Sequence, residues 1–202
     1  MKFAYSIMLC FVLAASGCVS NTGDQKVNSI EDISIDHVML GQPDIENTDF
    51  YQRYYNQSGG YVLIEESNSS IFSPEHDAES GLDRLYSFNM QGDNFNAEAP
   101  QGLIFGVERF ENSSKAQKSL DSFLEASSKS NITKMTSLNS SKGVYVMREE
   151  QVGGIDRYKN HYSFKFAREG AIVYGVMVSG SGEYYDNVAK ELFDLMKIKL
   201  ER

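Results

Sequence analysis

Alternation of apolar and polar side chains is clearest near the carboxyl end of the chain. Tyr162, Phe164 and Phe166 alternate with polar residues, and a second apolar series of the same period follows Gly170. The second series consists of Ile172, Tyr174, Val176 and Val178. A period of two is typical of β-strands, and a glycine supplies the positive φ that a tight turn needs. The pattern therefore predicts an antiparallel hairpin over residues 162–178.

Two other segments repeat their apolar residues at the spacing of an α-helix. The first is expected to begin at the capping residues 112–114 and to end within 127–131, and the second spans 184–200 with Ser181 as its expected cap. The first stripe consists of Ala116, Leu120, Phe123 and Leu124. The second stripe consists of Tyr185, Val188, Ala189, Leu192, Leu195 and Met196.

Weaker patterns predict the remaining elements. Strands are expected at 33–40, 61–66, 85–90, 103–110 and 144–149, and a short helix at 49–55, capped by Thr48 or Asp49. Residues 67–83 and 92–101 are expected to be long polar loops. Short links between strands favour antiparallel pairing, and two helices with one apolar stripe each are expected to cover one face of the sheet.

The sequence therefore predicts an α+β domain with a mainly antiparallel sheet covered by two helices. This order of strands, helix, strands and helix loosely resembles the α/β/α sandwich of PsbP-like proteins. The resemblance is one of topology, and it transfers no function to this chain.

The amino-terminal residues have the layout of a secretory signal. Lys2 precedes an apolar run of about thirteen residues, which is shorter than the roughly 20 needed to span a bilayer, and small residues follow it. The stretch Ala14-Ala15-Ser16-Gly17-Cys18 resembles the lipobox of prokaryotic lipoproteins. The resemblance implies cleavage before Cys18, whose thiol and new amino group then carry lipid. A plain signal peptide that happens to contain a cysteine is the alternative.

These observations predict three regions: a signal peptide over 1–17, a lipid-anchored flexible tether over 18–42, and a single folded domain over 43–202. Cys10 leaves with the signal, so the mature domain has no internal thiol and must rely on packing. The chain of 202 residues has a formal charge of −9. This charge argues against binding to nucleic acid or electrostatically to anionic lipid, so the membrane is expected as a partner only through the anchor.

Glycosylation sequons occur at Asn56, Asn68, Asn112, Asn131 and Asn139. They mark possible acceptors for N-linked glycans if the host has the enzyme and the sites are exposed. The alternative is that a chain rich in Asn and Ser simply contains the motif by composition.

Candidate chemistry in the sequence is sparse. His37, His76 and His161 are far apart, and the carboxylates from Glu75 to Asp83 lack the spacing of a calcium loop, so neither a metal ion nor another cofactor is expected. Ser181, between Gly180 and Gly182, lacks the frame of a nucleophile elbow.

One aromatic cluster offers a candidate platform for a carbohydrate or a peptide. It consists of Phe50, Tyr51, Tyr54, Tyr55 and Tyr61. The competing interpretation is a helix that packs its aromatic residues onto the sheet.

The sequence favours a lipid-anchored, extracytoplasmic lipoprotein of the cell envelope. Its domain is expected to act without catalysis, as a binding or assembly module for an envelope protein or a glycan. The alternative is a secreted enzyme with an active site built from loops, which motifs do not show.

Overall fold

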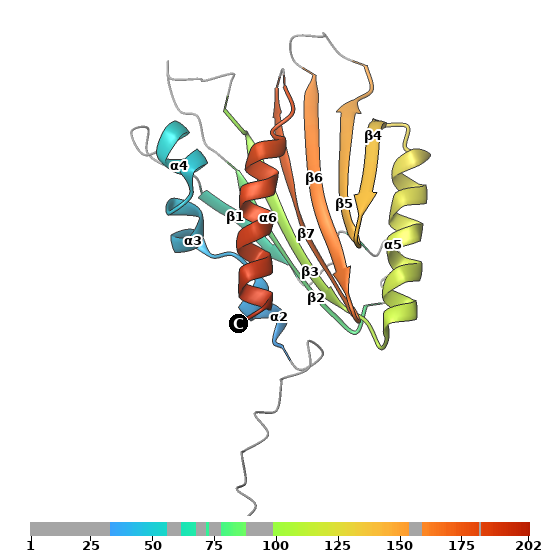
Figure 1. Ribbon diagram of the computed structural model, residues 1–202. Coiled ribbons are helices and arrows are strands. Elements are labelled where there is room, and N and C mark those ends of the chain that lie inside the picture. The colour runs from blue at the N-terminus through green and yellow to red at the C-terminus, as the bar shows by residue number, and fades with distance from the viewer. Residues whose placement is uncertain are drawn as a thin grey trace, which may run out of the picture.

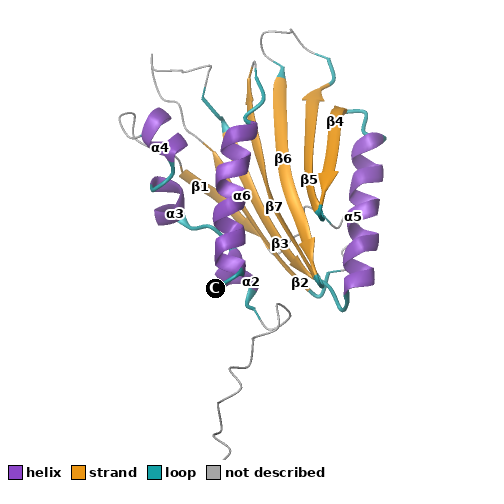
Figure 2. Ribbon diagram, viewed as in Figure 1, coloured by secondary structure: helices purple, strands orange, loops and turns teal. Residues whose placement is uncertain are grey.

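The computed structural model describes residues 33–55, 62–67, 72, 78–87, 99–153, 159–181 and 183–202. Within them the chain is α+β, as predicted, and forms a seven-stranded antiparallel sheet in the order β1-β2-β3-β7-β6-β5-β4 (Figures 1 and 2). The strands are β1 Val62–Ser67, β2 Ser80–Ser87, β3 Gly102–Arg109, β4 Thr133–Ser141, β5 Val144–Gln151, β6 Asn160–Glu169 and β7 Ile172–Ser181. The helices are α2 Ile35–Val38, α3 Gln42–Glu46, α4 Asp49–Tyr54, α5 Ser113–Ser128 and α6 Asp186–Leu200.

The predicted hairpin lies near the centre of this sheet. Glu169 pairs with Ile172 across the turn, and Gly170 has a φ of 59°. The apolar residues of β7 that share a face with Tyr174 point toward α6, where Tyr174 stacks on Phe193 with ring centroids 5.2 Å apart. The hairpin and α6 therefore pack on each other, as their patterns indicated.

The two long helices cover opposite faces of the sheet, so the prediction that they share one face is wrong. Helix α6 packs in a cluster with Phe105 and Val176, whereas α5 packs with Phe166 and Val173. Val173 and Val176 are an odd number of residues apart on β7, so their side chains point to opposite faces. Each strand at the centre of the sheet thus has apolar residues on both faces, and each face receives its own helix.

Several weaker predictions are confirmed with shifts of a few residues. Strands β1, β3 and β5 lie within two residues of the bounds that the sequence predicted. Helix α4 is capped by Thr48, whose side chain accepts a hydrogen bond from the Tyr51 amide, and α5 is capped by Asn112. In each cap, a side-chain oxygen accepts a hydrogen bond from a backbone amide in the first turn of the helix, where that amide has no partner within the helix.

Two strands depart from the prediction because pairing, not side-chain pattern, sets their bounds. Strand β2 begins at Ser80, inside a predicted loop, because all eight of its residues pair with β3; residues 88–90 of the predicted strand lie outside the described residues. Strand β4 was missed altogether. Its residues are mostly Ser, Thr and Asn, and it needs only the backbone of β5 as a partner.

Residues 33–40 form helix α2 and an extended segment, not the predicted strand. Val38, Met39 and Leu40 are at most 1% exposed and belong to the core on the side of α6. The spacing from Ile35 to Val38 is helical, and the segment lies across a face of the sheet instead of along an edge. The folded domain therefore includes residues 33–42, which the sequence assigned to the tether.

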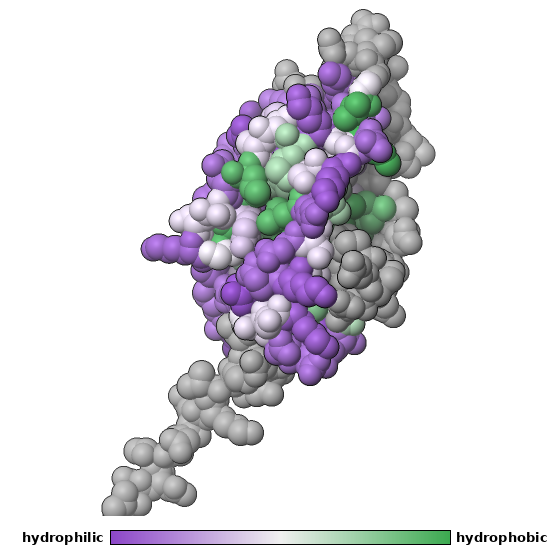
Figure 3. Space-filling model, turned by 90° about the vertical axis from the view of Figure 1, so that its right-hand side faces the viewer, coloured by the Kyte–Doolittle hydropathy of each residue, from purple (hydrophilic) through white to green (hydrophobic). Residues whose placement is uncertain are grey.

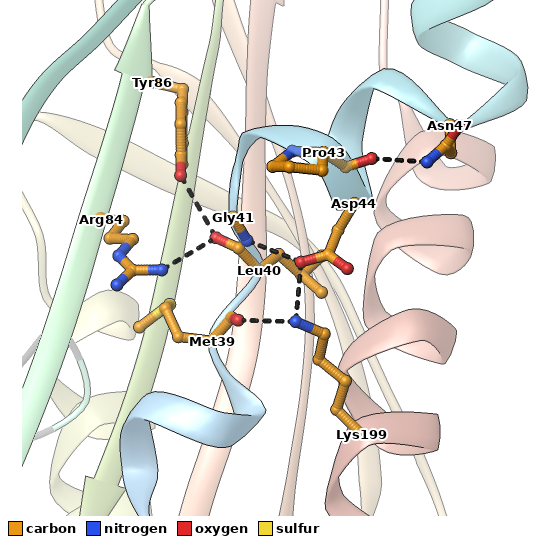
Figure 4. A network of polar contacts seen from close by, with 9 residues as sticks. All are labelled: Met39, Leu40, Gly41, Pro43, Asp44, Asn47, Arg84, Tyr86 and Lys199. Atoms are coloured by element: carbon orange, nitrogen blue, oxygen red, sulfur yellow. Dashed lines mark hydrogen bonds and ion pairs between the residues drawn. The ribbon is translucent and has the colours of Figure 1, made fainter.

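A network of polar contacts fixes this amino-terminal segment to α6 and β2 (Figure 4). The Lys199 ammonium donates to the Asp44 carboxylate at 2.7 Å and to the Met39 carbonyl at 3.2 Å. The same Asp44 oxygen accepts a hydrogen bond from the Gly41 amide at 2.8 Å.

On the other side of the segment, the carbonyl of Leu40 accepts from the Arg84 guanidinium at 3.3 Å and from the Tyr86 hydroxyl at 3.2 Å. The segment is thus held between the sheet and the last turns of α6. Among the described residues, no helix is long and apolar enough to cross a membrane.

We predict that Leu192→Ala destabilises the domain by about 2–5 kcal/mol, because it removes buried methyl groups and leaves a cavity beneath α6. Leu192 is fully buried, whereas Lys190 on the same helix is exposed. Lys190→Ala is the matched control and should leave the denaturation midpoint nearly unchanged. Equal losses for the two variants would show that the buried face of α6 is wrongly assigned.

We predict that Lys199→Met loosens the amino-terminal segment without unfolding the sheet, because it removes the cation that joins Asp44 to the Met39 carbonyl. Amide hydrogen exchange should accelerate over residues 39–47, and the stability should fall by about 1 kcal/mol. Lys197→Met is the control, since Lys197 forms an ion pair with the exposed Glu201 and not with the amino-terminal segment that the structure describes. Unchanged exchange over 39–47 in the Lys199 variant would contradict this role.

Candidate functional site

A groove of about 640 Å³ lies between α4 and the first turns of α6. One wall comes from α4 and the other from the segment that leads into α6. The lining residues are Asp49, Phe50, Arg53, Tyr54, Glu183, Tyr184, Tyr185, Asp186, Asn187, Val188 and Glu191. The two walls come from segments at least 129 residues apart in sequence, so only the folded chain brings them together.

Tyr185 sets the position of the α6 wall. Its ring lies on Gly180 near the end of β7, so closely that a Cβ at position 180 would come within 2.3 Å of the ring. A glycine is therefore needed beneath this tyrosine, and its close approach fixes where α6 begins. Tyr185 is only 4% exposed and forms the floor of the groove next to Phe50.

Glu191 joins the two walls. Its carboxylate accepts hydrogen bonds from the amides of Asp49, at 2.6 Å, and Phe50, at 3.4 Å. These amides belong to the first turn of α4 and have no partner within the helix. A carboxylate of α6 thus caps α4 and holds the groove at its observed width.

The predicted aromatic platform divides into core and surface residues. Phe50 and Tyr55 are 3% and 5% exposed, and the Tyr55 hydroxyl donates to the Pro100 carbonyl. Burial, with smaller contributions from Tyr185 and Tyr54, raises the pKa of Tyr55 far above its usual value. Tyr54 is half-buried, packs against the core and also lines the groove, with the Arg53 guanidinium 5.2 Å from its ring centroid. Tyr51 is partly buried against the core, and Tyr61 lies outside the described residues.

The charge of the groove is negative, with four carboxylates and one arginine in its lining. Glu191 is occupied by the α4 amides, and Asp186 forms an ion pair with Arg148 of β5. Asp49 and Glu183 form no ion pair with any residue that the structure describes. These two carboxylates can therefore attract a cationic group to the groove.

Polar side chains continue from the groove across the end of the sheet by way of Tyr184. The Arg148 guanidinium lies 5.2 Å from the centroid of the Tyr184 ring, and the His161 ring meets it edge-on at 4.8 Å. The Tyr184 hydroxyl is 2.8 Å from the hydroxyl of Thr136. The hydrogen bond to Asp186 raises the pKa of Arg148, so the guanidinium stays charged. The sequence analysis missed this cluster, although the adjacent pair Tyr184-Tyr185 before a helix was a signal for it.

The described residues around this cluster do not form a nucleophilic relay. Ser163 is 1% exposed, and neither its Oγ nor Nδ1 of His161 has a hydrogen-bond partner within the described part of the chain. A serine relay requires its hydroxyl and imidazole to be hydrogen-bonded. Ser181 is the last residue of β7, where it accepts a hydrogen bond from Gln101 at 2.8 Å, so its prediction as the cap of α6 is wrong. Tyr185 occupies that cap position.

The remaining predicted sites are scattered. Asn112, Asn131 and Asn139 are exposed, and Asn112 uses its side-chain oxygen to cap α5. His37 is exposed on α2, and Asp83 of the acidic stretch is buried in β2. The predicted sites outside the described residues are Cys18, Asn56, Asn68, Glu75 and His76. Within the described part of the chain, no three His, Cys, Asp or Glu residues converge as metal ligands would.

Comparison with known proteins identifies a related fold and no family. No family model matches the chain, and no curated protein matches it by sequence. Among solved structures, the chain is similar to the extracellular domain of PknH from Mycobacterium tuberculosis, with a TM-score of 0.54 and 10% sequence identity. The match covers 82% of this chain and 97% of that domain. At this identity the likeness shows a shared fold alone.

We predict that Glu191→Ala opens the groove, because the first amides of α4 lose their cap. Loss of a capping group costs about 0.5–2 kcal/mol, and hydrogen exchange should accelerate over residues 49–55. Glu183→Ala is the control, because Glu183 lines the same groove and caps no helix. If both variants left exchange in α4 unchanged, Glu191 would not hold the wall in place.

Proposed function

We propose that this protein is a lipid-anchored, extracytoplasmic binding or assembly module of the cell envelope, attached through Cys18. The stretch from Ala14 to Cys18 supports the anchor, since it has the small residues and the thiol that lipidation requires. The likeness to a solved domain described as extracellular supports the compartment. The groove between α4 and α6 is the proposed binding site.

The observation that carries this proposal is the position of the groove relative to the point where the described chain begins. Ile33 lies beside Arg109 at the end of β3, and the adjoining Val38 and Leu40 pack in the same cluster as Leu200, the last residue of α6 (Figure 1). The groove lies at the other end of α6, whose 15 residues span about 22 Å. A lipid anchor on the preceding segment would therefore leave the groove facing away from the membrane.

The chemistry of the groove favours a partner that carries cationic groups beside an apolar or sugar face. Asp49 and Glu183 supply negative charge, and the rings of Tyr54 and Tyr184 supply surfaces on which cations and sugar faces pack favourably. An envelope protein or a glycan with amino groups has this character. The two tyrosines lie on the two walls that Glu191 joins, so little ordering is needed on binding.

We predict that Cys18→Ala releases the protein from the membrane or blocks its processing. The wild-type chain should partition into detergent and should have an intact mass that corresponds to a start at Cys18 plus lipid. Several acyl chains hold a protein firmly, whereas one holds it reversibly, so the mass also reports the strength of the anchor. An unlipidated wild-type chain cleaved at another residue would refute the anchor.

We predict that a photoreactive benzoylphenylalanine at position 54 cross-links the protein to an envelope component in intact cells. Asp49 and Glu183 are the carboxylates that attract a cationic group to the groove. The adduct should therefore be lost when both are changed to the corresponding amides. The same probe at position 121, an exposed aspartate on α5, is the control. Identical adducts from both positions, or none from position 54, would count against binding in the groove.

A further inference from the structure

Strand β4 ends the sheet with an edge that no described strand covers. Its nine residues pair with β5 on one side only, and it occupies the last place in the strand order. Outside the β4–β5 ladder, no backbone hydrogen bond reaches residues 134–141 from any described residue. Helix α5 packs against β4 but makes no backbone hydrogen bond to this edge among the described residues, so the outward amides and carbonyls can pair with another extended chain.

The protection that natural sheets give their edges is weak here. Edge strands are usually shortened, charged, interrupted by proline or covered. β4 has one lysine, Lys134, and one irregularity between Met135 and Ser137. Residues 138–141 contain neither a charge nor a proline, and all four are exposed. Leu138 is 42% exposed, and Ile132, just before the strand, is 75% exposed.

The charge along this edge differs from that of the whole chain. Residues 126–147 contain Lys129, Lys134 and Lys142 and no acidic residue, whereas the chain as a whole has 28 acidic residues and a net charge of −9. Lys129 is paired with Glu125, but Lys134 and Lys142 are exposed and have no ion pair with the described residues. Figure 3 shows this side of the molecule, where apolar residues lie among hydrophilic ones over β4 and α5.

We propose that the outer edge of β4 binds an extended, acidic segment of a partner protein, which adds an eighth strand to the sheet. The backbone of β4 supplies the hydrogen bonds, and Lys134 and Lys142 select carboxylates at the two ends of the segment. Ile132 and Val152, joined by a hydrogen bond from the Val152 amide to the Ile132 carbonyl at 2.8 Å, offer an exposed apolar contact where the segment ends. This surface adjoins the groove through the contact between Thr136 of β4 and Tyr184, and it does not depend on the proposed anchor.

A second copy of the chain fits the edge less well. A β4–β4 antiparallel pair places the two copies in opposite directions along the strand, so their amino-terminal segments leave at opposite ends of the joined sheet. It also brings two acidic domains together. An acidic strand from another protein does not require two amino-terminal segments to leave at opposite ends of one sheet. Its carboxylates also pair with Lys134 and Lys142.

The test uses the full-length chain in detergent micelles and three fluorescent nonapeptides. The probe has the sequence Glu-Val-Thr-Val-Glu-Val-Thr-Val-Glu. One control replaces its three glutamates by lysine, and the other replaces its two threonines by proline, which removes backbone donors and keeps the charge. Fluorescence polarisation measures affinity, and hydrogen exchange read by mass spectrometry locates the bound peptide.

The glutamate peptide should bind at least tenfold more tightly than either control and should slow amide exchange in residues 133–141. The double variant Lys134→Gln, Lys142→Asn should weaken its binding on the order of threefold to tenfold, while Lys118→Gln on α5 should not. No protection of β4, or equal binding of all three peptides, would overturn the proposal. Protection of β4 that rises with protein concentration in the absence of peptide would overturn it in favour of a second copy.

Discussion

The packing of α6 on β7 is the interaction on which most of the molecule depends. Tyr174 is fully buried and stacks on Phe193 with an interplanar angle of 8°. Lys165 of β6 reaches over the Phe193 ring, with its ammonium 4.7 Å from the centroid of that ring, and forms an ion pair with Asp194. Although burial opposes ionisation, hydrogen bonds from Lys190 and Lys165 lower the pKa of Asp194. Apolar contacts hold the buried face of the helix, and an ion pair with Lys165 holds its side. Its carboxyl end contacts the amino-terminal segment, and its amino end lines the groove.

The opposite face of the sheet is arranged around Phe166, which explains why a second helix is needed. Gly175 lies opposite Phe166 on β7, and a Cβ there would come within 2.4 Å of the Cβ of Phe166. Phe166 also stacks on Tyr145 of β5. Without a covering layer, the apolar surface of these rings would be exposed to water on this face. Leu120 of α5 packs in the same cluster and covers it. An aromatic layer on both faces of a sheet cannot be covered from one side.

The sequence predicted elements with strong side-chain patterns and missed those that depend on partners. The stripe with Leu192 and the alternation around Tyr174 are visible because burial on one face imposes a period. β4 has no such period, since an edge strand is specified by the backbone of its neighbour. The single-face prediction was wrong because it followed one stripe per helix and did not consider that the apolar series of the two hairpin strands, Phe164 and Phe166 on β6 and Val176 and Val178 on β7, lie on opposite faces of the sheet. The groove was unpredictable for a related reason: Glu191 caps α4 from 142 residues away, and no local pattern records such a contact.

Helix α6 contacts the amino-terminal segment at one end and lines the groove at the other. Lys199 fixes the entering chain at the carboxyl end of the helix, while Tyr185 and Glu191 place the groove wall at its amino end. Because both contacts are made to one helix of 15 residues, the separation between this segment and the groove is fixed. At the edge of the same sheet, β4 has no second strand partner among the described residues, and Thr136 of β4 connects this edge to the groove through Tyr184.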